Sequence, residues 1–221
     1  MVSNSKLLEL FDKCKFDELR DALMENTRAE ALKKSGVKST DAAIIKRLIK
    51  SIEKMTPALR CVHSFEYCGY DLFALTNGYY VLADNFNFGI ENPENMRPLD
   101  MSKIFQDPQE YNNSFNVDMD SLRAYLQYIK AFKLDIKENP YIIDTPAGYI
   151  GLNPQYLLDS LEYCNTNIIH FQNMKTTLKS PVLIQSGGAR FALVLPVHIS
   201  DVEKAIQRVN EINNKMMEVV A

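Results

Sequence analysis

The hydrophobic spacing of this chain changes from helical to strand-like and back, and this change restricts the fold more than any other feature. Residues 39–55 begin with Ser-Thr-Asp, an N-cap sequence, and carry apolar side chains at helical spacing. Residues 59–68 and 71–83 are instead rich in β-branched and aromatic residues and are separated by Gly69-Tyr70, which predicts two strands. The alternation predicts an α+β fold in which helices back an antiparallel sheet.

Four further segments have helical spacing or helix-capping residues. They are residues 4–34, a helix or helical hairpin ended by Ser35-Gly36; residues 118–133, capped by Asp118; a short helix begun by Asn153-Pro154; and a final amphipathic helix from Ser200 or Asp201. Five further segments predict strands: residues 141–143 and 149–152, joined by the turn Thr145-Pro146-Ala147-Gly148, then 167–172, 181–185 and 190–198, the last two joined by Ser186-Gly187-Gly188.

Between the strands and the second half of the chain, residues 84–114 are rich in Asn, Pro, Glu and Asp. Pro93, Pro98 and Pro108 block long regular elements, so this stretch predicts a long loop or insertion at about 84–116. The predicted organisation is an N-terminal helical region (1–36), a central α+β domain (37–200) and a C-terminal helix (201–221).

Composition excludes few functions. The net charge is −3 at pH 7, so any nucleic-acid contact requires a local basic stripe rather than a basic molecule. The first twenty residues lack the apolar core of a signal peptide and no run approaches the length of a membrane span, so we expect a cytoplasmic protein without a membrane partner. The 4 scattered cysteines then predict reduced thiols.

The usual patterns of enzymes do not occur in the sequence. Cys61 and His63 share one face of a predicted strand, but Cys68 falls on the other face and nothing completes a set of four zinc ligands. Nucleophile-elbow, phosphate-loop and paired-carboxylate patterns are also missing. The sequence therefore predicts a non-catalytic protein with no metal and no cofactor.

A cationic stripe follows the polar side of the predicted 39–55 helix. Evenly spaced cations are sufficient for sequence-neutral contact with the phosphates of double-stranded DNA, although such a stripe is more often a solvated helix face. The residues are Lys46, Arg47, Lys50 and Lys54.

Four stretches of the chain resemble one protein family in order and spacing. Residues 150–161 (IGLNPQYLLDSL) resemble a strand-to-helix segment in the third domain of the bacterial sliding clamp, the DNA polymerase III beta subunit. Residues 180–184 (SPVLI) and 191–199 (FALVLPVHI) resemble its last two strands, and residues 72–82 (LFALTNGYYVL) resemble a strand of its second domain. The resemblance covers roughly residues 40–83 and 149–199. The first clamp domain has no counterpart, and neither terminal helical region matches the family.

The resemblance implies a DNA-clamp-like fold with extra terminal helices and a hydrophobic groove that binds short linear peptides of replication proteins. Carried over position by position, the groove residues are Leu59, Thr76, Gly78, Tyr79, Tyr80, Val81, Asn153, Tyr156, Val182, Ile184, Leu195, Pro196, Val197 and His198. The chain departs from the family at Asn77, where clamps have Asp, at Tyr79 and Tyr80, where they have His and Arg, and at His198, where they have Arg. We therefore expect a more aromatic and less cationic groove.

Three alternatives remain open at the level of sequence. The same residues are also what the core of a clamp-like fold needs, without any groove. A clamp-fold interaction or regulatory module of a mobile element would keep the fold without a processivity role. An enzyme acting on a nucleotide or nucleic acid through a diverged site would escape motif searches. Homo-oligomer formation is compatible with each of them, because strands that pair between subunits look like any others.

Overall fold

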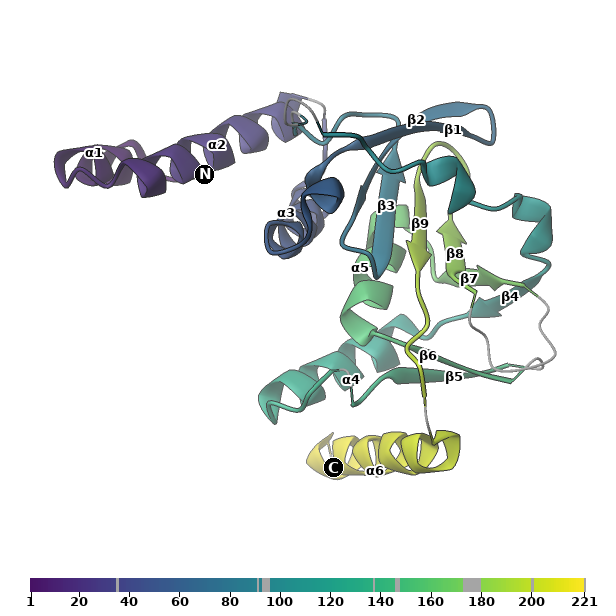
Figure 1. Ribbon diagram of the computed structural model, residues 1–221. Coiled ribbons are helices and arrows are strands. Elements are labelled where there is room, and N and C mark those ends of the chain that lie inside the picture. The colour runs from purple at the N-terminus through teal and green to yellow at the C-terminus, as the bar shows by residue number, and fades with distance from the viewer. Residues whose placement is uncertain are drawn as a thin grey trace.

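A seven-stranded antiparallel sheet forms the centre of the computed structural model (Figure 1). The structure describes residues 1–34, 36–90, 92, 96–136, 138–145, 148–172, 180–199 and 201–220, with side chains up to 216. The sheet order is β1-β2-β3-β9-β8-β7-β4, and a separate hairpin contains β5 and β6. The strands are β1 His63–Tyr67, β2 Tyr70–Thr76, β3 Tyr80–Asp84, β4 Asn113–Asn116, β5 Tyr141–Thr145, β6 Gly148–Leu152, β7 Ile168–Phe171, β8 Val182–Gln185 and β9 Phe191–Val194.

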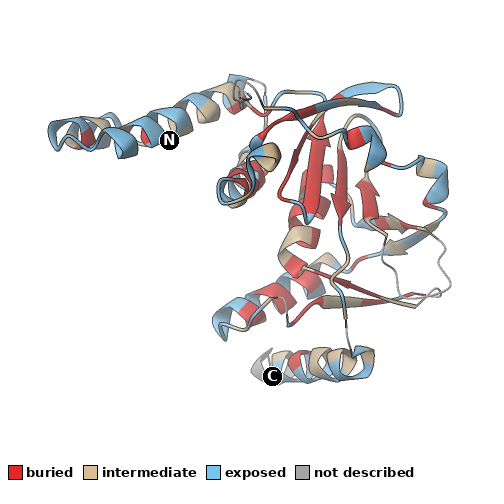
Figure 2. Ribbon diagram, in the orientation of Figure 1, coloured by how far each residue is buried: buried red, intermediate tan, exposed pale blue. Residues whose placement is uncertain are grey.

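Three helices supply the core on one face of this sheet and confirm the predicted α+β class; the first and third contact the strands, and the second packs on the third. They are α3 Ser39–Ile52, α4 Met119–Ala131 and α5 Pro154–Cys164. The predicted caps of the last two are confirmed, since Asp118 and Asn153 each accept hydrogen bonds from two N–H groups of the first turn. Buried side chains of the helices meet those of the central strands in one continuous core (Figure 2).

The prediction of one strand over residues 71–83 is wrong. The stretch forms two antiparallel strands, β2 and β3, joined by a tight turn at Asn77-Gly78-Tyr79. The Asn77 Oδ1 atom accepts the N–H groups of Tyr79 at 3.0 Å and Tyr80 at 3.1 Å, and Gly78 has φ +83°. Asn-Gly is a strong hairpin sequence, but the apolar residues on both sides hid the break in the strand.

Two other predicted strands are shorter than expected. Residues Pro57–Arg60 form a 3-10 helix, so the strand predicted from residue 59 begins only at His63. The strand predicted over 190–198 ends at Val194, close to Pro196, which has no N–H group to extend the ladder. The predicted features at Ser35, Pro93, Pro146, Ala147 and Ser200 lie outside the described residues.

The segment predicted as a long loop covers the second face of the sheet and supplies one of its strands. Met101, Phe105 and Tyr111 are buried against β2, β3, β8 and β9. Asn113–Asn116 forms β4, which pairs with β7 at the sheet edge. The loop prediction is therefore wrong at its end, because widely spaced apolar anchors and a four-residue polar strand have no readable period.

Helices outside the core lie at both ends of the described chain. Helices α1 (Asn4–Asp12) and α2 (Phe16–Lys34) form a hairpin that projects from the body, whereas α6 (Val202–Val220) lies along α4 and β5 (Figure 1). Within the described residues, no helix combines the length and apolar character needed to cross a bilayer.

Arg190, just before β9, links four elements through a partly buried polar network. Its guanidinium contacts Asp41 of α3 at 2.7 Å and Asp84 of β3 at 3.0 Å, and it donates to the backbone oxygen of Tyr163 on α5. The Tyr163 hydroxyl donates to Asp84 at 2.8 Å. The network therefore pins the last turn of α5 to the sheet and to α3.

His63 of β1 forms a hydrogen bond with the segment that covers the second face of the sheet, and this contact predicts a pH dependence of stability. Its Nδ1 atom accepts the Leu99 N–H at 2.9 Å, and Nε2 has no hydrogen-bond partner among the described residues. Burial lowers the pKa of His63 from 6.5 to about 4. A lowered pKa in the folded state gives stability that is present above 6.5 and is lost as the pH falls toward 4.

We expect the free energy of unfolding to fall by about 3 kcal/mol between pH 7 and pH 4 because of this histidine. In His63→Gln that part of the fall disappears, whereas His198→Gln, which changes an exposed histidine, retains it. Urea denaturation across this pH range measures the difference. An identical pH dependence in all three proteins would contradict the assignment.

Candidate functional site

Three tyrosines from two distant segments form a stacked group, here called the tyrosine platform: Tyr79, Tyr80 and Tyr156. The Tyr156 ring lies 4.6 Å from the Tyr80 ring at an interplanar angle of 18°, and 6.4 Å from the Tyr79 ring at 21°. Tyr80 is buried, Tyr156 is half-buried and Tyr79 is 52% exposed. The platform thus has a buried base and an accessible aromatic edge.

Asparagine side chains hold both parts of the platform in place. Asn77 fixes the turn before Tyr79 and Tyr80, and its Nδ2 group donates to Ser51 of α3 at 3.2 Å. Asn153 accepts the Tyr156 N–H at 3.2 Å as the N-cap of α5. Burial raises the pKa of Tyr156, while a hydrogen bond with Asn77 acts in the opposite direction.

Two leucines from other segments lie beside the turn that carries Tyr79. The Leu195 N–H donates to the Tyr79 carbonyl oxygen at 2.9 Å, and Leu195 is 41% exposed. A Cβ atom placed on Gly78 would lie 3.6 Å from Leu59 Cδ1. Aromatic and aliphatic surface from four segments therefore meets at one place, where an apolar side chain of a ligand can be covered.

Four residues predicted for the groove are buried and do not reach the exposed surface of the platform. Val182 and Ile184 are fully buried in the core beneath the helices, and Val81 packs on the opposite face of the sheet. Thr76 is buried, and its Oγ1 atom accepts the Gly78 N–H at 3.0 Å. These four residues present little or no surface to a peptide.

The remaining predicted residues follow β9. Pro196 and Val197 are half-buried, and His198 is exposed. The Val197 N–H donates to the Gly151 carbonyl oxygen at 2.8 Å. The segment after β9 therefore runs from the platform to the last residues of β6. The segment therefore borders the platform on the side of the β5–β6 hairpin.

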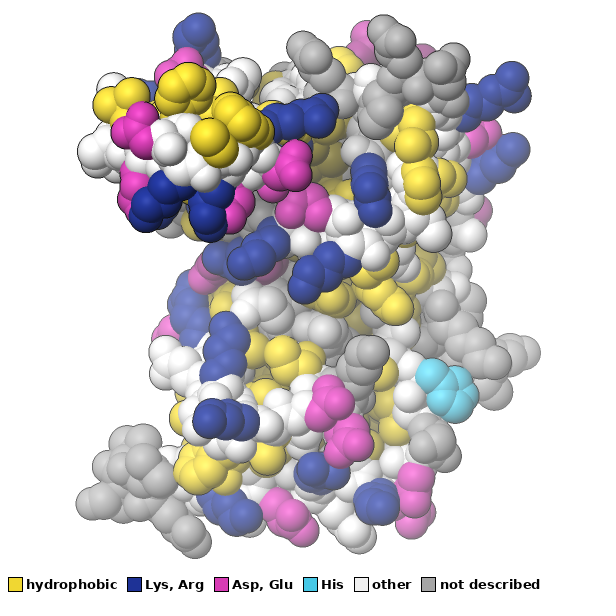
Figure 3. Space-filling view, turned by 60° about the vertical axis from the view of Figure 1, so that its left-hand side comes forward, with side chains coloured by type: hydrophobic (Ala, Val, Ile, Leu, Met, Phe, Trp, Pro, Cys, Tyr) yellow, Lys and Arg dark blue, Asp and Glu magenta, His cyan; other side chains and the backbone are white. Residues whose placement is uncertain are grey.

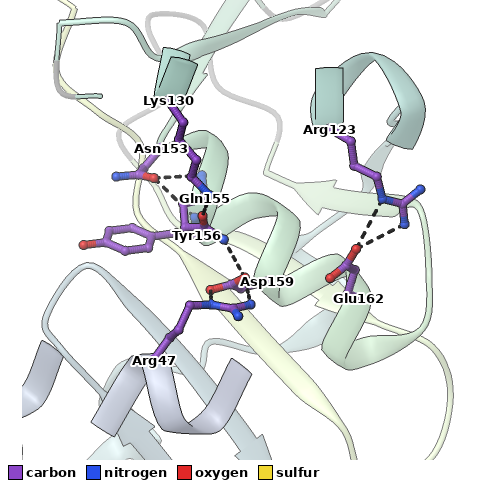
Figure 4. A network of polar contacts seen from close by, with 8 residues as sticks. All are labelled: Arg47, Arg123, Lys130, Asn153, Gln155, Tyr156, Asp159 and Glu162. Atoms are coloured by element: carbon purple, nitrogen blue, oxygen red, sulfur yellow. Dashed lines mark hydrogen bonds and ion pairs between the residues drawn. The ribbon is translucent and has the colours of Figure 1, made fainter. Parts of the chain in front are cut away.

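Two of the four residues in the predicted cationic stripe form internal ion pairs. Lys46 pairs with Glu25 of α2, and Arg47 forms a two-point contact with Asp159 of α5 at 2.6 and 3.2 Å (Figure 4). Lys50 and Lys54 are exposed and make no ion pair within the described part of the chain. Two of the four cations therefore have their charge balanced within the molecule, while all four side chains are exposed.

Helix α5, which carries Tyr156, is also tied to α4. Lys130 donates to Gln155 at 2.6 Å, and Arg123 contacts Glu162 at 3.1 Å (Figure 4). Gln155 in turn donates to Asp159 at 2.8 Å. The first two turns of α5 are therefore held from both sides.

Sequence reasoning missed Asn77 and Asp159 as positioning residues. The Asn77-Gly78 dipeptide carries a readable turn signal, so Asn77 could have been found. Asp159 lies on the buried side of a short amphipathic helix, which was an indication that it needs a partner. The identity of that partner, Arg47, has no sequence signal because 112 positions separate the two residues.

A cavity of about 780 Å³ lies away from the platform, between α4 and α6. Its lining contains none of the predicted groove residues; it includes Phe132, Leu134, Arg208 and Ile212. No cluster of three or more metal-ligating side chains occurs among the described residues.

No protein-family model matches this chain, and no curated protein matches it either. Solved bacterial sliding clamps are similar to part of it. The Helicobacter pylori beta clamp bound to DNA ligase peptide is 15% identical with a TM-score of 0.46, over 72% of this chain and 63% of the clamp. The Pseudomonas aeruginosa sliding clamp with ligand is 12% identical with a TM-score of 0.46, over 72% of this chain and 65% of the clamp. The chain thus spans less than two thirds of the length of these clamps.

The Arg47–Asp159 pair predicts a large difference between two neighbouring substitutions on α3. Asp159 is 1% exposed, and burial raises its pKa, so it depends on the Arg47 contact, which opposes that shift. Arg47→Met leaves the buried Asp159 carboxylate without its cation. Because Arg47 is half exposed, solvent screens the pair, and we expect the free energy of unfolding to fall by about 2 kcal/mol. Lys50→Met, one turn away and exposed, should change it by less than about 0.5 kcal/mol. Urea denaturation compares them, and equal effects would contradict a structural role for Arg47.

Proposed function

We propose that this protein is a non-catalytic binding protein that presents the tyrosine platform to short linear peptides of DNA replication or repair proteins. The observation that carries the proposal is the stacking of the Tyr156 ring on the Tyr79 ring, next to Leu195, whose N–H donates a hydrogen bond to the Tyr79 carbonyl oxygen. These residues come from three segments that resemble sliding-clamp sequence around its peptide groove. Their meeting in space is what a shared binding surface requires.

The chemistry of the platform suits a peptide with aromatic or aliphatic anchors. Tyrosine offers a large apolar area with little rotational freedom, and its hydroxyl can donate or accept a hydrogen bond. Because Asn77 and Asn153 fix the backbone under the rings, little ordering is required when a ligand binds. An anchor that covers Tyr79 and Leu195 would remove their exposed area from water.

The shape of the surface limits the size of the contact. Val182 and Ile184 lie wholly in the core, so a peptide would rest across the platform rather than enter a deep pocket. A contact of a few side chains is smaller than a standard protein interface. We therefore expect affinity in the range of about 1 to 100 μM.

One observation favours a binding module over a DNA-retaining clamp. Lys46 and Arg47 form ion pairs with Glu25 and Asp159, so within the described residues only Lys50 and Lys54 of the stripe have no internal counter-charge. Two cations release few counterions from DNA, so any contact would be weak at physiological salt. The second candidate function, after the one proposed above, is therefore an interaction or regulatory role without a processivity function.

Fluorescence anisotropy with a labelled peptide tests the proposal. The probe is the DNA ligase peptide bound by the Helicobacter pylori clamp. We expect saturable binding that weakens at least about tenfold in Tyr79→Ala and in Leu195→Asp, because central apolar anchors dominate small interfaces. Both positions are exposed, so neither change should unfold the protein.

Tyr70→Ala is the matched control, because it removes a tyrosine that is 40% exposed on β2 and lies outside the platform. It should bind like the unchanged protein. Equal affinity in all variants would place the peptide elsewhere, and no saturable binding by the folded protein would reject the proposal. A separate titration with labelled double-stranded DNA separates the two candidates: saturable DNA binding at physiological salt would count against a DNA-independent module.

A further inference from the structure

The α1–α2 hairpin has few attachments to the rest of the molecule. Leu32, near the end of α2, joins the main core. Two exposed ion pairs, Glu25 with Lys46 and Arg28 with Glu53, connect α2 to α3 and the residues just after it. The remainder of the hairpin extends away from the sheet and helices (Figure 1). The parts of α1 and α2 beyond these attachments pack on each other alone, and such helices are marginal in water without a further apolar partner surface.

The projecting hairpin exposes large apolar side chains. They are Leu8 at 63%, Phe11 at 58%, Phe16 at 59%, Leu23 at 49% and Met24 at 42% exposure. By contrast, only Leu10, Ala22 and Leu32 are buried among the hydrophobic residues of these two helices. Hydrophobic side chains gather over this hairpin in Figure 3, where it faces the viewer at upper left.

The spacing of these residues makes one continuous stripe. Leu8 and Phe11 are three positions apart on α1, and Phe16 and Leu23 are seven positions apart on α2, so each pair shares a helix face. The rings of Phe11 and Phe16 contact each other edge to face at 6.3 Å, which joins the two faces. The hairpin thus has a second apolar face besides the one that holds α1 against α2.

We propose that this stripe binds the same stripe of a second copy of the chain, so that two hairpins form a four-helix bundle. The charges favour a like partner over a nucleic acid or a strongly charged protein. Residues 1–34 contain seven basic and seven acidic side chains, so two hairpins do not repel each other. Several of these charges already pair within the hairpin, such as Lys13 with Glu9 and Lys15 with Glu18.

The exposed area also matches what a stable pair needs. Large apolar residues expose about 200 Å² each when free, so five of them at about half exposure offer roughly 500 Å² per copy. Two copies would bury about 1,000 Å², which is near the lower limit of specific interfaces. A two-fold arrangement uses the stripe twice, and antiparallel helical hairpins commonly pair this way.

Sedimentation velocity of the whole chain over a range of concentrations tests the pairing. We expect a dimer whose dissociation constant rises at least tenfold in Leu8→Glu/Phe11→Glu, because four charges would enter the bundle. Phe132→Glu is the control, since it changes an equally exposed aromatic residue near the end of α4 and should leave the dimer intact. Circular dichroism verifies that helix content is unchanged.

Two results would overturn the proposal: a monomer at every concentration, or a dimer that Leu8→Glu/Phe11→Glu does not weaken. If that double variant loses helix content, the uncharged variant Phe16→Gln replaces it and should still weaken the dimer. The proposed peptide surface lies on the body of the molecule and not on the hairpin, so its assay succeeds or fails independently of this one.

Discussion

The burial of Asp159 on α5 is the constraint on which the position of the candidate site depends. A carboxylate removed from water requires a paired cation, and Arg47 of α3 supplies it with a two-point contact. Apolar residues on the same helix pack on the sheet, and Arg123 and Lys130 of α4 hold its outer side. With α5 fixed, Tyr156 in its first turn can lie only against β3 and the turn before it.

Periodicity was sufficient to predict the helices, because each shows its apolar face and most show a capping residue. Asn153-Pro154 predicts the start of α5 at the residue where it begins. The strands were harder, since a hairpin turn inside an apolar stretch leaves the composition nearly unchanged, as at Asn77-Gly78. β4 and the buried anchors Met101 and Phe105 could not be predicted, because tertiary packing alone gives those residues their places.

The candidate site was predictable in part. Resemblance to a family indicated the segments that meet at the platform, and the structure brings Tyr79, Tyr156 and Leu195 together. The resemblance could not show on which face of the sheet each residue lies. Neighbouring strand residues point to opposite faces, so Val81 packs on the face opposite Tyr80. Arg47 was predicted as a DNA contact, but the partner that engages it is distant in sequence.

Hydrogen–deuterium exchange with saturating DNA ligase peptide locates the bound peptide on the chain, and so measures whether the tyrosine platform is a peptide-binding surface. We expect slower exchange confined to residues 77–81, 153–158 and 195–198, with no change on the hairpin of α1 and α2. Slower exchange only at the cavity between α4 and α6, or no change at all, would contradict it.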